Sequence, residues 1–118
     1  MPKLNKMKCE ACDGSEKRLS ANEIQTLMQE VGEWSLIDDS GTQKLRRQFN
    51  TKHYKKSISF VNAIAQLAES VNHHPLLIVE YSSVTVEWWS HNINGLHKND
   101  FIMAAKTGDL ILNIDEKH

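Results

Sequence analysis

The chain has 118 residues, of which 40% are hydrophobic and 25% charged, with a formal net charge of -1 at neutral pH. This length and composition predict a single soluble globular domain, and the small charge gives no reason to expect nucleic acid or an anionic membrane as a partner. No apolar run approaches the roughly 20 residues that a membrane span needs, and the first residues lack the apolar core of a signal peptide. We therefore expect a cytoplasmic protein.

Residues 1–18 have no hydrophobic period and are expected to form a flexible N-terminal arm ahead of a domain over residues 19–118. The arm contains Cys9 and Cys12 in a lone Cys-x-x-Cys. A zinc site needs two more ligands, and a thioredoxin-type motif needs a βαβ context that is absent from this pattern. Two reduced thiols are therefore the favoured interpretation.

The first predicted helix begins after Ser20. Ser20 and Glu23 match a capping box, and Leu19 and Ile24 occupy the two positions of a hydrophobic staple. Apolar residues then recur at helical spacing until Gly32, which is predicted to end the helix.

Two strands are predicted next, over residues 34–37 and 44–50, separated by a turn rich in Asp and Gly. In the second strand Leu45 and Phe49 share a face with Arg47. An arginine between two apolar neighbours indicates an edge or a partly covered surface.

The longest helix is predicted from about Lys52 to Asn72. Its apolar stripe is wider than a helix on one sheet face needs, so part of it is expected to face another subunit. A helix that is merely well buried is the alternative. Pro75 disfavours the α conformation at the preceding residue, so the helix should end near His73 or His74.

Two further strands are predicted over residues 76–81 and 84–90, with Ser82 and Ser83 as the loop. This register separates apolar from polar side chains, as a correct register should. The apolar face would hold Leu77, Val79, Tyr81, Val84, Val86 and Trp88, and the polar face Glu80, Ser82, Ser83, Thr85 and Glu87. Carried to the strand ends, the register places His74 opposite His91, and directly opposed residues have Cβ atoms roughly 5 Å apart.

The last segment, from about Lys98 to Ile114, is predicted to be helical, although Gly108 weakens it by about 1 kcal/mol relative to alanine. The element order is helix, strand, strand, helix, strand, strand, helix. Paired hairpins with helices between them predict an α+β fold, with an antiparallel sheet and helices on one face.

The predicted convergence of His73, His74 and His91 bears most directly on function. A metal site is disfavoured, because adjacent residues of an extended chain point to opposite sides and the helical pair spacing of zinc hydrolases is missing. Structural histidines at a helix end are another possibility. A tandem pair with a third histidine from another strand favours acid–base chemistry near neutral pH, with Glu69 and Asp100 as carboxylates that orient or charge-tune the imidazoles.

Several motifs follow one another in a characteristic order: Glu69-x-x-x-His73-His74-Pro75, Tyr81-x-x-Val84, Ser90-His91, Gly95-Leu96 and Asp100. In this order, from about Leu19 to the C-terminus, the chain resembles pterin-4a-carbinolamine dehydratases. The resemblance implies a four-stranded antiparallel sheet covered by helices, a homodimer or homotetramer, and no metal or other cofactor. It also implies dehydration of 4a-hydroxytetrahydropterin to quinoid dihydropterin, which regenerates the cofactor of aromatic amino-acid hydroxylases.

The same resemblance assigns roles to single residues without saying which histidine is the acid. The catalytic residues that it implies are His73, His74 and His91. The substrate-binding residues are Glu69, Asn72, Pro75, Ser90 and Asp100.

Two positions depart from the family pattern. Leu76-Leu77 stand where the family often has an aromatic residue, so Trp89 is expected to contribute to stacking on the pterin. His97 stands where the family usually has Ser or Thr at the start of the last helix. Histidine is expected to cap poorly there, so Asp100 would carry more of the helix start.

Two other functions remain open. Animal members of the family also serve as dimerisation cofactors of a homeodomain transcription factor, which is a binding role without chemistry. A relative of these enzymes could instead act on another pterin, as in the molybdenum cofactor pathway. A functional link to an aromatic amino-acid hydroxylase would favour the dehydratase.

Overall fold

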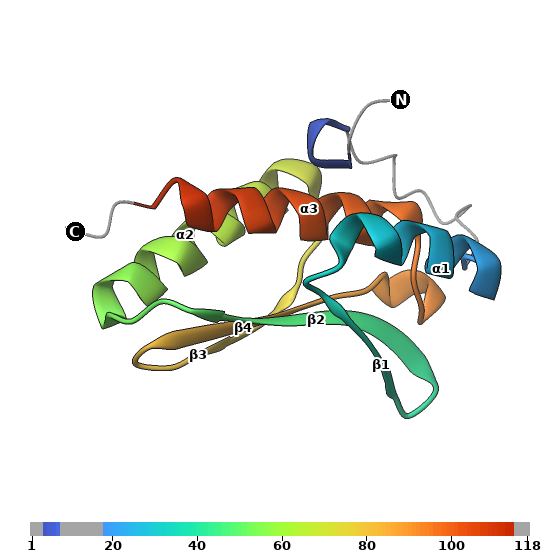
Figure 1. Ribbon diagram of the computed structural model, residues 1–118, viewed down its shortest axis with the longest axis horizontal. Helices are drawn as coiled ribbons and strands as arrows, with labels where there is room; N and C mark the ends of the chain where they lie inside the picture. Colours follow the sequence, from blue (N-terminus) through green and yellow to red (C-terminus); the bar gives the residue numbers. More distant parts are fainter. Residues whose placement is uncertain (1–3, 8–17, 115–118) are drawn as a thin grey trace.

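The computed structural model describes residues 4–7 and 18–114. In this part of the chain, four antiparallel strands form one sheet in the order β1-β2-β4-β3, and the helices lie on one face of it (Figure 1). This arrangement confirms the predicted α+β class and element order. The strands are β1 (Ser35–Asp39), β2 (Thr42–Asn50), β3 (Leu76–Val79) and β4 (Ser83–Trp88); the α-helices are α1 (Ala21–Met28), α2 (Tyr54–Val71) and α3 (Lys98–Leu112); and the 3-10 turns are η1 (Leu4–Lys6), η2 (Gln29–Val31) and η3 (His91–Ile93).

The helix α1 starts with the predicted capping box. The Glu23 backbone N–H donates to Ser20 Oγ at 3.2 Å, and the Ser20 backbone N–H donates to Glu23 Oε1 at 2.8 Å. The helix tightens into η2, and Gly32 follows with φ -59°, in the right-handed region. Gly32 therefore ends the segment without the left-handed conformation of a glycine cap, because the 3-10 turn closes the helix.

Asn72 ends α2, slightly before the predicted position. Its φ and ψ of 53° and 43° are left-handed, and its backbone N–H donates to the carbonyl oxygens of Ala68 and Glu69. Asparagine tolerates this conformation better than most residues. The reversal at Asn72 turns the chain into the extended segment that leads through Pro75 to β3.

The β3–β4 hairpin forms, but its predicted register is wrong by two residues. Leu77 pairs with Val86 and not with Trp88, and Val79 pairs with Val84. The Glu80 backbone N–H donates to the Ser83 carbonyl oxygen at 2.9 Å, so the loop is longer than Ser82-Ser83 alone. Extended past the strand ends, this register sets His74 level with Trp89, so the predicted strand pairing of His74 with His91 is also wrong.

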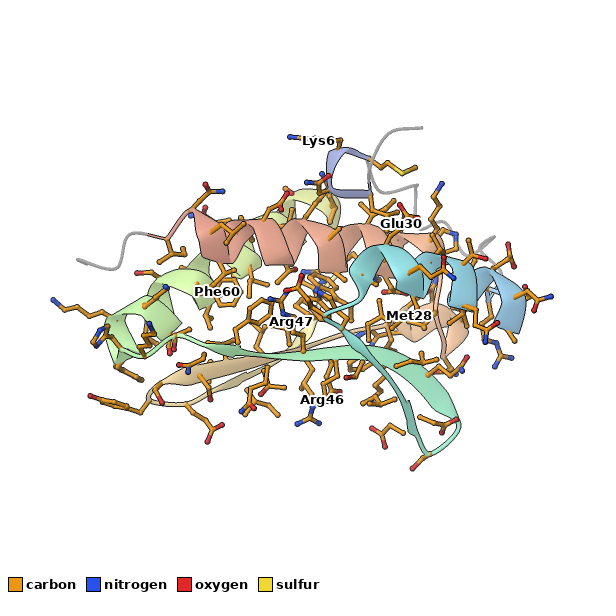
Figure 2. The ribbon with its side chains drawn as sticks, viewed as in Figure 1. Lys6, Met28, Glu30, Arg46, Arg47 and Phe60 are labelled. Carbon is orange, nitrogen blue, oxygen red and sulfur yellow. The ribbon has the colours of Figure 1, made fainter. Side chains whose placement is uncertain are left out.

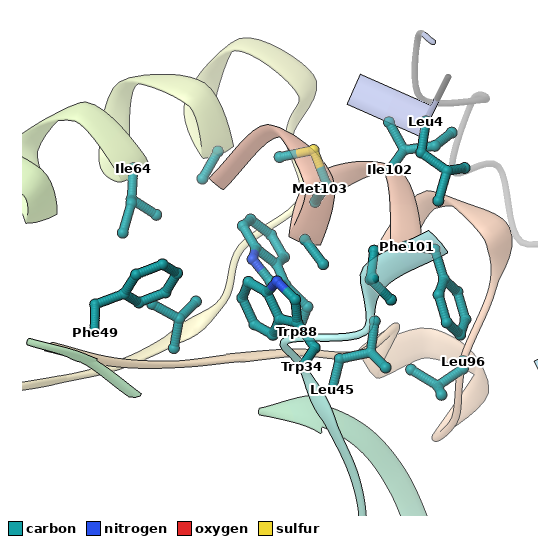
Figure 3. Close-up of a cluster of buried hydrophobic side chains, with 14 of the residues drawn as sticks. Leu4, Trp34, Leu45, Phe49, Ile64, Trp88, Leu96, Phe101, Ile102 and Met103 are labelled. Carbon is teal, nitrogen blue, oxygen red and sulfur yellow. The ribbon is translucent and has the colours of Figure 1, made fainter. Parts of the chain in front are cut away.

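The core lies between the sheet and the helices. Figure 3 shows Trp88, Trp34 and Phe49 above the sheet, with Ile64 and Met103 approaching them from the helices. Trp88 is fully buried, and its indole N–H donates to Thr107 Oγ1 of α3 at 3.1 Å. This bond satisfies the polar end of a large core side chain and ties β4 to α3.

The opposite face of the sheet has no helix over it, yet the centre of this face is not exposed. Thr85 and Glu87 were predicted on this polar face, yet they are only 3% and 5% exposed. Both belong to the central strand β4, which lies between β2 and β3. Glu87 also forms ion pairs with Arg46 at 3.0 Å and Lys44 at 3.9 Å, so its charge is compensated.

Part of the N-terminal segment belongs to the core. The η1 turn packs on α3, and Leu4 is buried. Asn5 Nδ2 donates to Asp109 Oδ2 at 2.5 Å, and Lys106 Nζ donates to the Asn5 carbonyl oxygen at 3.1 Å. The expectation of an arm without core contacts is therefore wrong for Leu4. Cys9 and Cys12 lie outside the described residues, and the boundary at residue 19 stays a prediction.

Candidate active site

The buried carboxylate of Asp100, in the first turn of α3, joins three segments of the chain. Its Oδ1 lies 2.7 Å from His73 Nε2. Its Oδ2 accepts a hydrogen bond from the Ser90 hydroxyl at 2.8 Å and another from the His97 backbone N–H at 2.9 Å. An ionised carboxylate only accepts hydrogen bonds, and in that form Asp100 is satisfied by donors from the ends of α2 and β4 and the start of α3.

This arrangement determines where the other two histidines lie. His73 is the neighbour of His74 along the chain, and Ser90 is the neighbour of His91. Because His73 and Ser90 bind the same carboxylate, the backbones that carry His74 and His91 are held at a fixed separation. The strand register that predicted their convergence is wrong, and the shared Asp100 carboxylate is the contact that links the two segments.

His73 is buried, with 6% of its surface exposed. Its ring stacks on Trp88 with centroids 5.6 Å apart and planes at 18°. When Nε2 donates to the Asp100 carboxylate, Nδ1 is the nitrogen left to exchange a proton. Of the three histidines, His73 is the buried one, and it is held by both Asp100 and Trp88.

His74 is exposed and paired with a carboxylate. Its Nε2 lies 2.5 Å from Glu69 Oε2, and the two side chains are 52% and 76% exposed. Glu69 belongs to the last turn of α2, and the left-handed Asn72 turns the chain back so that the two side chains meet. This contact orients the imidazole and does not involve Nδ1.

His91 is exposed at the start of η3 and is held by an aromatic ring. Its imidazole stacks on Trp89 with centroids 4.3 Å apart, and Lys44 Nζ lies 3.9 Å from the centroid of the same indole. The backbone beside His91 is fixed by a bridge in which the Ser90 N–H donates to the Gly95 carbonyl oxygen at 2.8 Å. His91 is therefore positioned by stacking, whereas His74 is positioned by a carboxylate.

His97 caps α3, contrary to expectation. Its Nδ1 accepts a hydrogen bond from the Asn99 backbone N–H at 3.1 Å, and Asp100 bonds back to the His97 backbone. An imidazole nitrogen thus replaces the hydroxyl oxygen of a common N-cap. Asp100 does contribute to the helix start, but it shares this role with His97 and does not replace a missing cap.

The remaining predicted site residues, Asn72 and Pro75, shape the backbone on either side of the two adjacent histidines. Asn72 is the exposed cap of α2, and Pro75 is half-buried between His74 and β3. Trp88 was not expected at the site, although it contacts His73; its position in the pair Trp88-Trp89 just before Ser90 was the available signal.

Neither a metal-binding cluster nor a membrane-spanning helix occurs in residues 4–7 and 18–114. These residues contain no group of three or more His, Cys, Asp or Glu side chains placed to hold a metal ion. Their helices also include none with both the length and the apolar character that crossing a membrane requires.

Comparisons with known proteins are consistent over most of the chain. The model of the family described as pterin 4 alpha carbinolamine dehydratase matches residues 17–110. A protein of Nitrosococcus oceani, provisionally named a pterin-4-alpha-carbinolamine dehydratase, is 45% identical over 94% of this chain and 98% of its own length. A protein of Chlorobaculum tepidum with the same provisional name is 43% identical over 94% of this chain and 100% of its own length.

Solved structures show the same fold. A crystal structure from Brucella melitensis, described as a transcriptional coactivator/pterin dehydratase, superposes with a TM-score of 0.73 at 26% identity over 80% of this chain and 98% of that chain. A pterin dehydratase-like protein described as a RuBisCO assembly factor of the alpha-carboxysome gives a TM-score of 0.58 at 20% identity over 67% of this chain and 89% of that chain. The chain belongs to the pterin 4 alpha carbinolamine dehydratase family.

Proposed function

We propose that this protein is a hydro-lyase that dehydrates 4a-hydroxytetrahydropterin, the 4a-carbinolamine, to quinoid dihydropterin by histidine acid–base catalysis. Family membership supports the reaction class. The observation that carries the mechanism is the Asp100 carboxylate, which binds the chain neighbours of both exposed histidines. Two imidazoles at a fixed separation are suited to a reaction that needs one proton delivered and another removed.

The bonds, electrons and protons of the proposed dehydration balance without an oxidant or a metal ion. A general acid protonates the hydroxyl group on carbon 4a, and the carbon–oxygen bond breaks to release water. The lone pair of the adjacent ring nitrogen forms a double bond to carbon 4a, and a general base takes the proton from that nitrogen. Each proton transfer by a positioned side chain contributes typically about 10²–10⁴-fold.

Exposure supports a division of labour among the histidines. His74 and His91 are exposed, so we assign to them the proton transfers with the substrate. His73 is buried against Trp88, and we assign to it the role of holding the Asp100 carboxylate and the segment that follows α2. Glu69 orients His74, while Asn72, Pro75 and Ser90 shape the chain around the pterin.

We further propose that the protein is a cytoplasmic homodimer or homotetramer, with a pterin as its small-molecule partner and with no nucleic-acid or membrane partner. After reduction, quinoid dihydropterin can serve again as the cofactor of a hydroxylase. We therefore propose a functional link to an aromatic amino-acid hydroxylase that generates the carbinolamine.

The first prediction tests the acid–base assignment. His74→Ala and His91→Ala should each lower the rate of dehydration roughly 10²-fold or more, because each removes a proton-transferring group from an exposed position. The measurement is the rate of quinoid dihydropterin formation from the carbinolamine, with chelator present and without it. His53→Ala is the matched control, because His53 is also exposed but sits at the start of α2 without a side-chain cap bond.

Wild-type rates in both single variants would remove the assignment. Activity that chelator abolishes and zinc restores would replace it with metal chemistry. A His53→Ala variant as slow as His74→Ala would mean that the loss reflects folding and not proton transfer.

A binding role is the second candidate. The Brucella melitensis structure is described as a coactivator as well as a dehydratase, and in this chain Leu76, Ile78 and Tyr81 are exposed at the free edge of the sheet. A partner-binding role should survive combined replacement of His74 and His91 by alanine, whereas dehydration should not. Activity on other carbinolamine-bearing pterins would distinguish a relative that serves another pterin pathway.

A further inference from the structure

A cavity of about 550 Å³ lies beside α3, away from the histidines, and none of the site residues described above lines it. Ala105 and Asp109, which do line it, follow Asp100 by five and nine positions. In a helix of 3.6 residues per turn this rotates them by about 140° and 180° from Asp100. These two residues therefore face away from the Asp100 contacts, whereas Ala104 and Ile111, which line the cavity further along α3, are rotated by only about 40° and 20° from Asp100. The volume of the cavity falls in the usual range for small-molecule sites, about 300–1,000 Å³.

Arg47 lines the cavity and gives it a positive group. The side chain lies in the layer between the sheet and α3, whereas Arg46 points away from the helices (Figure 2). Its guanidinium carbon is 4.2 Å from the centroid of the Phe49 ring. A Cβ at Gly108 of α3 would lie 3.2 Å from Arg47 Nη1, so glycine lets the helix pass close to the guanidinium.

The carboxylate partner of Arg47 is replaceable. Arg47 Nη2 lies 2.8 Å from Glu33 Oε2, but the Glu33 side chain is 77% exposed while that of Arg47 is 21% exposed. Exposed ion pairs contribute little stability. A guanidinium carries five N–H donors in a planar fork that matches a carboxylate. A ligand carboxylate can therefore displace Glu33 at small cost.

Acceptors line another part of the same cavity. Glu30 and Asp109 contribute carboxylates, and Asp109 is held in place by Asn5 Nδ2 at 2.5 Å. Asn5 also lines the cavity, and its Oδ1 is buried with no hydrogen-bond partner in the described part of the chain. A buried acceptor left unpaired is unfavourable, and a ligand that brings N–H donors would relieve it.

The rest of the lining is apolar, with Val31, Ala105 and Ile111 among its members. The carboxylates would repel an anionic ligand, and the guanidinium would repel a cationic one. We propose that this cavity binds a small zwitterion with an apolar side chain, of the α-amino acid class. Its carboxylate would bind Arg47, its ammonium would bind Asp109 and Glu30, and its side chain would contact Val31 and Ala105.

The test is a titration of the full-length protein with leucine, followed by calorimetry and by amide chemical shifts. Isoamylamine lacks the carboxylate of leucine, and isocaproate lacks its amino group. Each should bind at least about tenfold more weakly than leucine, the ratio expected for loss of one charge-assisted contact. Shifts should concentrate on α3 near Asp109 and on η2.

Two variants locate the binding. Ala105→Leu places a larger side chain in the cavity and should abolish binding. Position 105 is half-buried in a helix, where a leucine residue is well tolerated. Asp109→Asn keeps an acceptor for Asn5 but removes the charge, and it should weaken leucine about tenfold without weakening isocaproate. Saturable leucine binding with these losses supports the proposal.

Three results would overturn it. The first is no saturable binding of leucine or phenylalanine at millimolar concentration. The second is leucine binding that survives Ala105→Leu. The third is equal binding of leucine, isoamylamine and isocaproate, since this would show that the charged groups are not recognised. Dehydration is a separate readout, so failure here leaves the proposed reaction untouched.

Discussion

At the scale of single residues, the Asp100 carboxylate links three residues that come from different segments of the chain. It accepts hydrogen bonds from Ser90 and His97 and lies against His73. Removing a carboxylate from water is costly, and donors from all sides offset that cost. The same three contacts start α3, anchor His73 and hold the backbone next to His91.

The second prediction is that Asp100→Asn slows dehydration between about ten- and a hundredfold, because small displacements of catalytic groups have effects of this size. The asparagine oxygen can keep Ser90 and His97, but its amide now faces His73. We expect kcat to fall with KM little changed, and Asp100→Glu should not restore the rate because its side chain is longer.

A matched variant separates geometry from stability. Ser57→Ala removes a buried hydroxyl that contacts Thr51, outside the site, and should cost stability of the order of 1 kcal/mol without slowing dehydration. Equal slowing in both variants at a temperature where both are folded would count against a positioning role for Asp100.

The role of Asp100 shows what the sequence could not predict. The motif order that includes His73, His74, His91 and Asp100 was sufficient to recognise the family. A lone aspartate, however, has no periodicity that reports burial, and a donor set drawn from three segments exists only once the chain is folded. His97 as a cap was missed for a related reason, since propensity describes the average histidine and not one whose Nδ1 faces a helix start.

At the scale of elements, the β3–β4 hairpin illustrates the limit of face patterns. Side chains alternate with a period of two, so a shift of two residues keeps the paired strand residues on their predicted faces. Tyr81 is the exception, because β3 ends at Val79 and Tyr81 is 72% exposed. The apolar and polar sets were therefore predictable, but the pairing partners were not. The backbone hydrogen bond from Glu80 to Ser83 decides between the two registers, and Ser-Ser is a weak turn signal.

The third prediction compares the two faces of β4. Val86→Asp should unfold the protein or destabilise it severely, because it places an unpaired charge in the core under the helices. Thr85→Asp should also destabilise it, because Thr85 is buried and lies two residues from Glu87 on the same face, but the loss should be smaller because no helix covers that face (Figure 1). Urea unfolding measures both. A harmless Thr85→Asp would show that this face is open to water.

The fourth prediction concerns α1 and acid. The Ser20 backbone N–H and then the Ser20 hydroxyl lower the pKa of Glu23 below its ordinary value of 4.5. A lowered pKa in the folded state means that the stabilisation is complete above the ordinary value and is lost as pH falls through the lowered one. Glutamine keeps the capping contact without the charge.

Thermal unfolding of the wild type and Glu23→Gln across this acidic range is the measurement. The difference between their melting temperatures should shrink as pH falls. A difference that stays constant from neutral to strongly acidic pH would mean that the charge on Glu23 makes no contribution through the cap.

At the scale of the whole molecule, the exposed apolar side chains are unevenly distributed. Leu76, Ile78 and Val79 are exposed on the edge strand β3, and Tyr54 and Ile58 on α2. An edge strand offers unpaired backbone groups that can pair with another chain. These surfaces support the proposed homo-oligomer and the expectation that part of α2 faces another subunit.

The fifth prediction is that Ile78→Lys combined with Val79→Lys lowers the oligomeric state, because two charges at this edge would be buried or repelled on pairing. Light scattering at micromolar concentration is the measurement. Leu36→Lys is the control, since Leu36 is similarly exposed but on the other edge strand, β1. A wild-type monomer, or equal dissociation by the control, would contradict the proposal.

The start of α3 has one more consequence, which concerns heat. The residues that begin this helix, His97 and Asp100, also hold the segments next to His74 and His91. Fraying of the first turn would release both histidine-bearing segments at once. Thermal inactivation should therefore follow melting of that turn, even where the sheet is still folded.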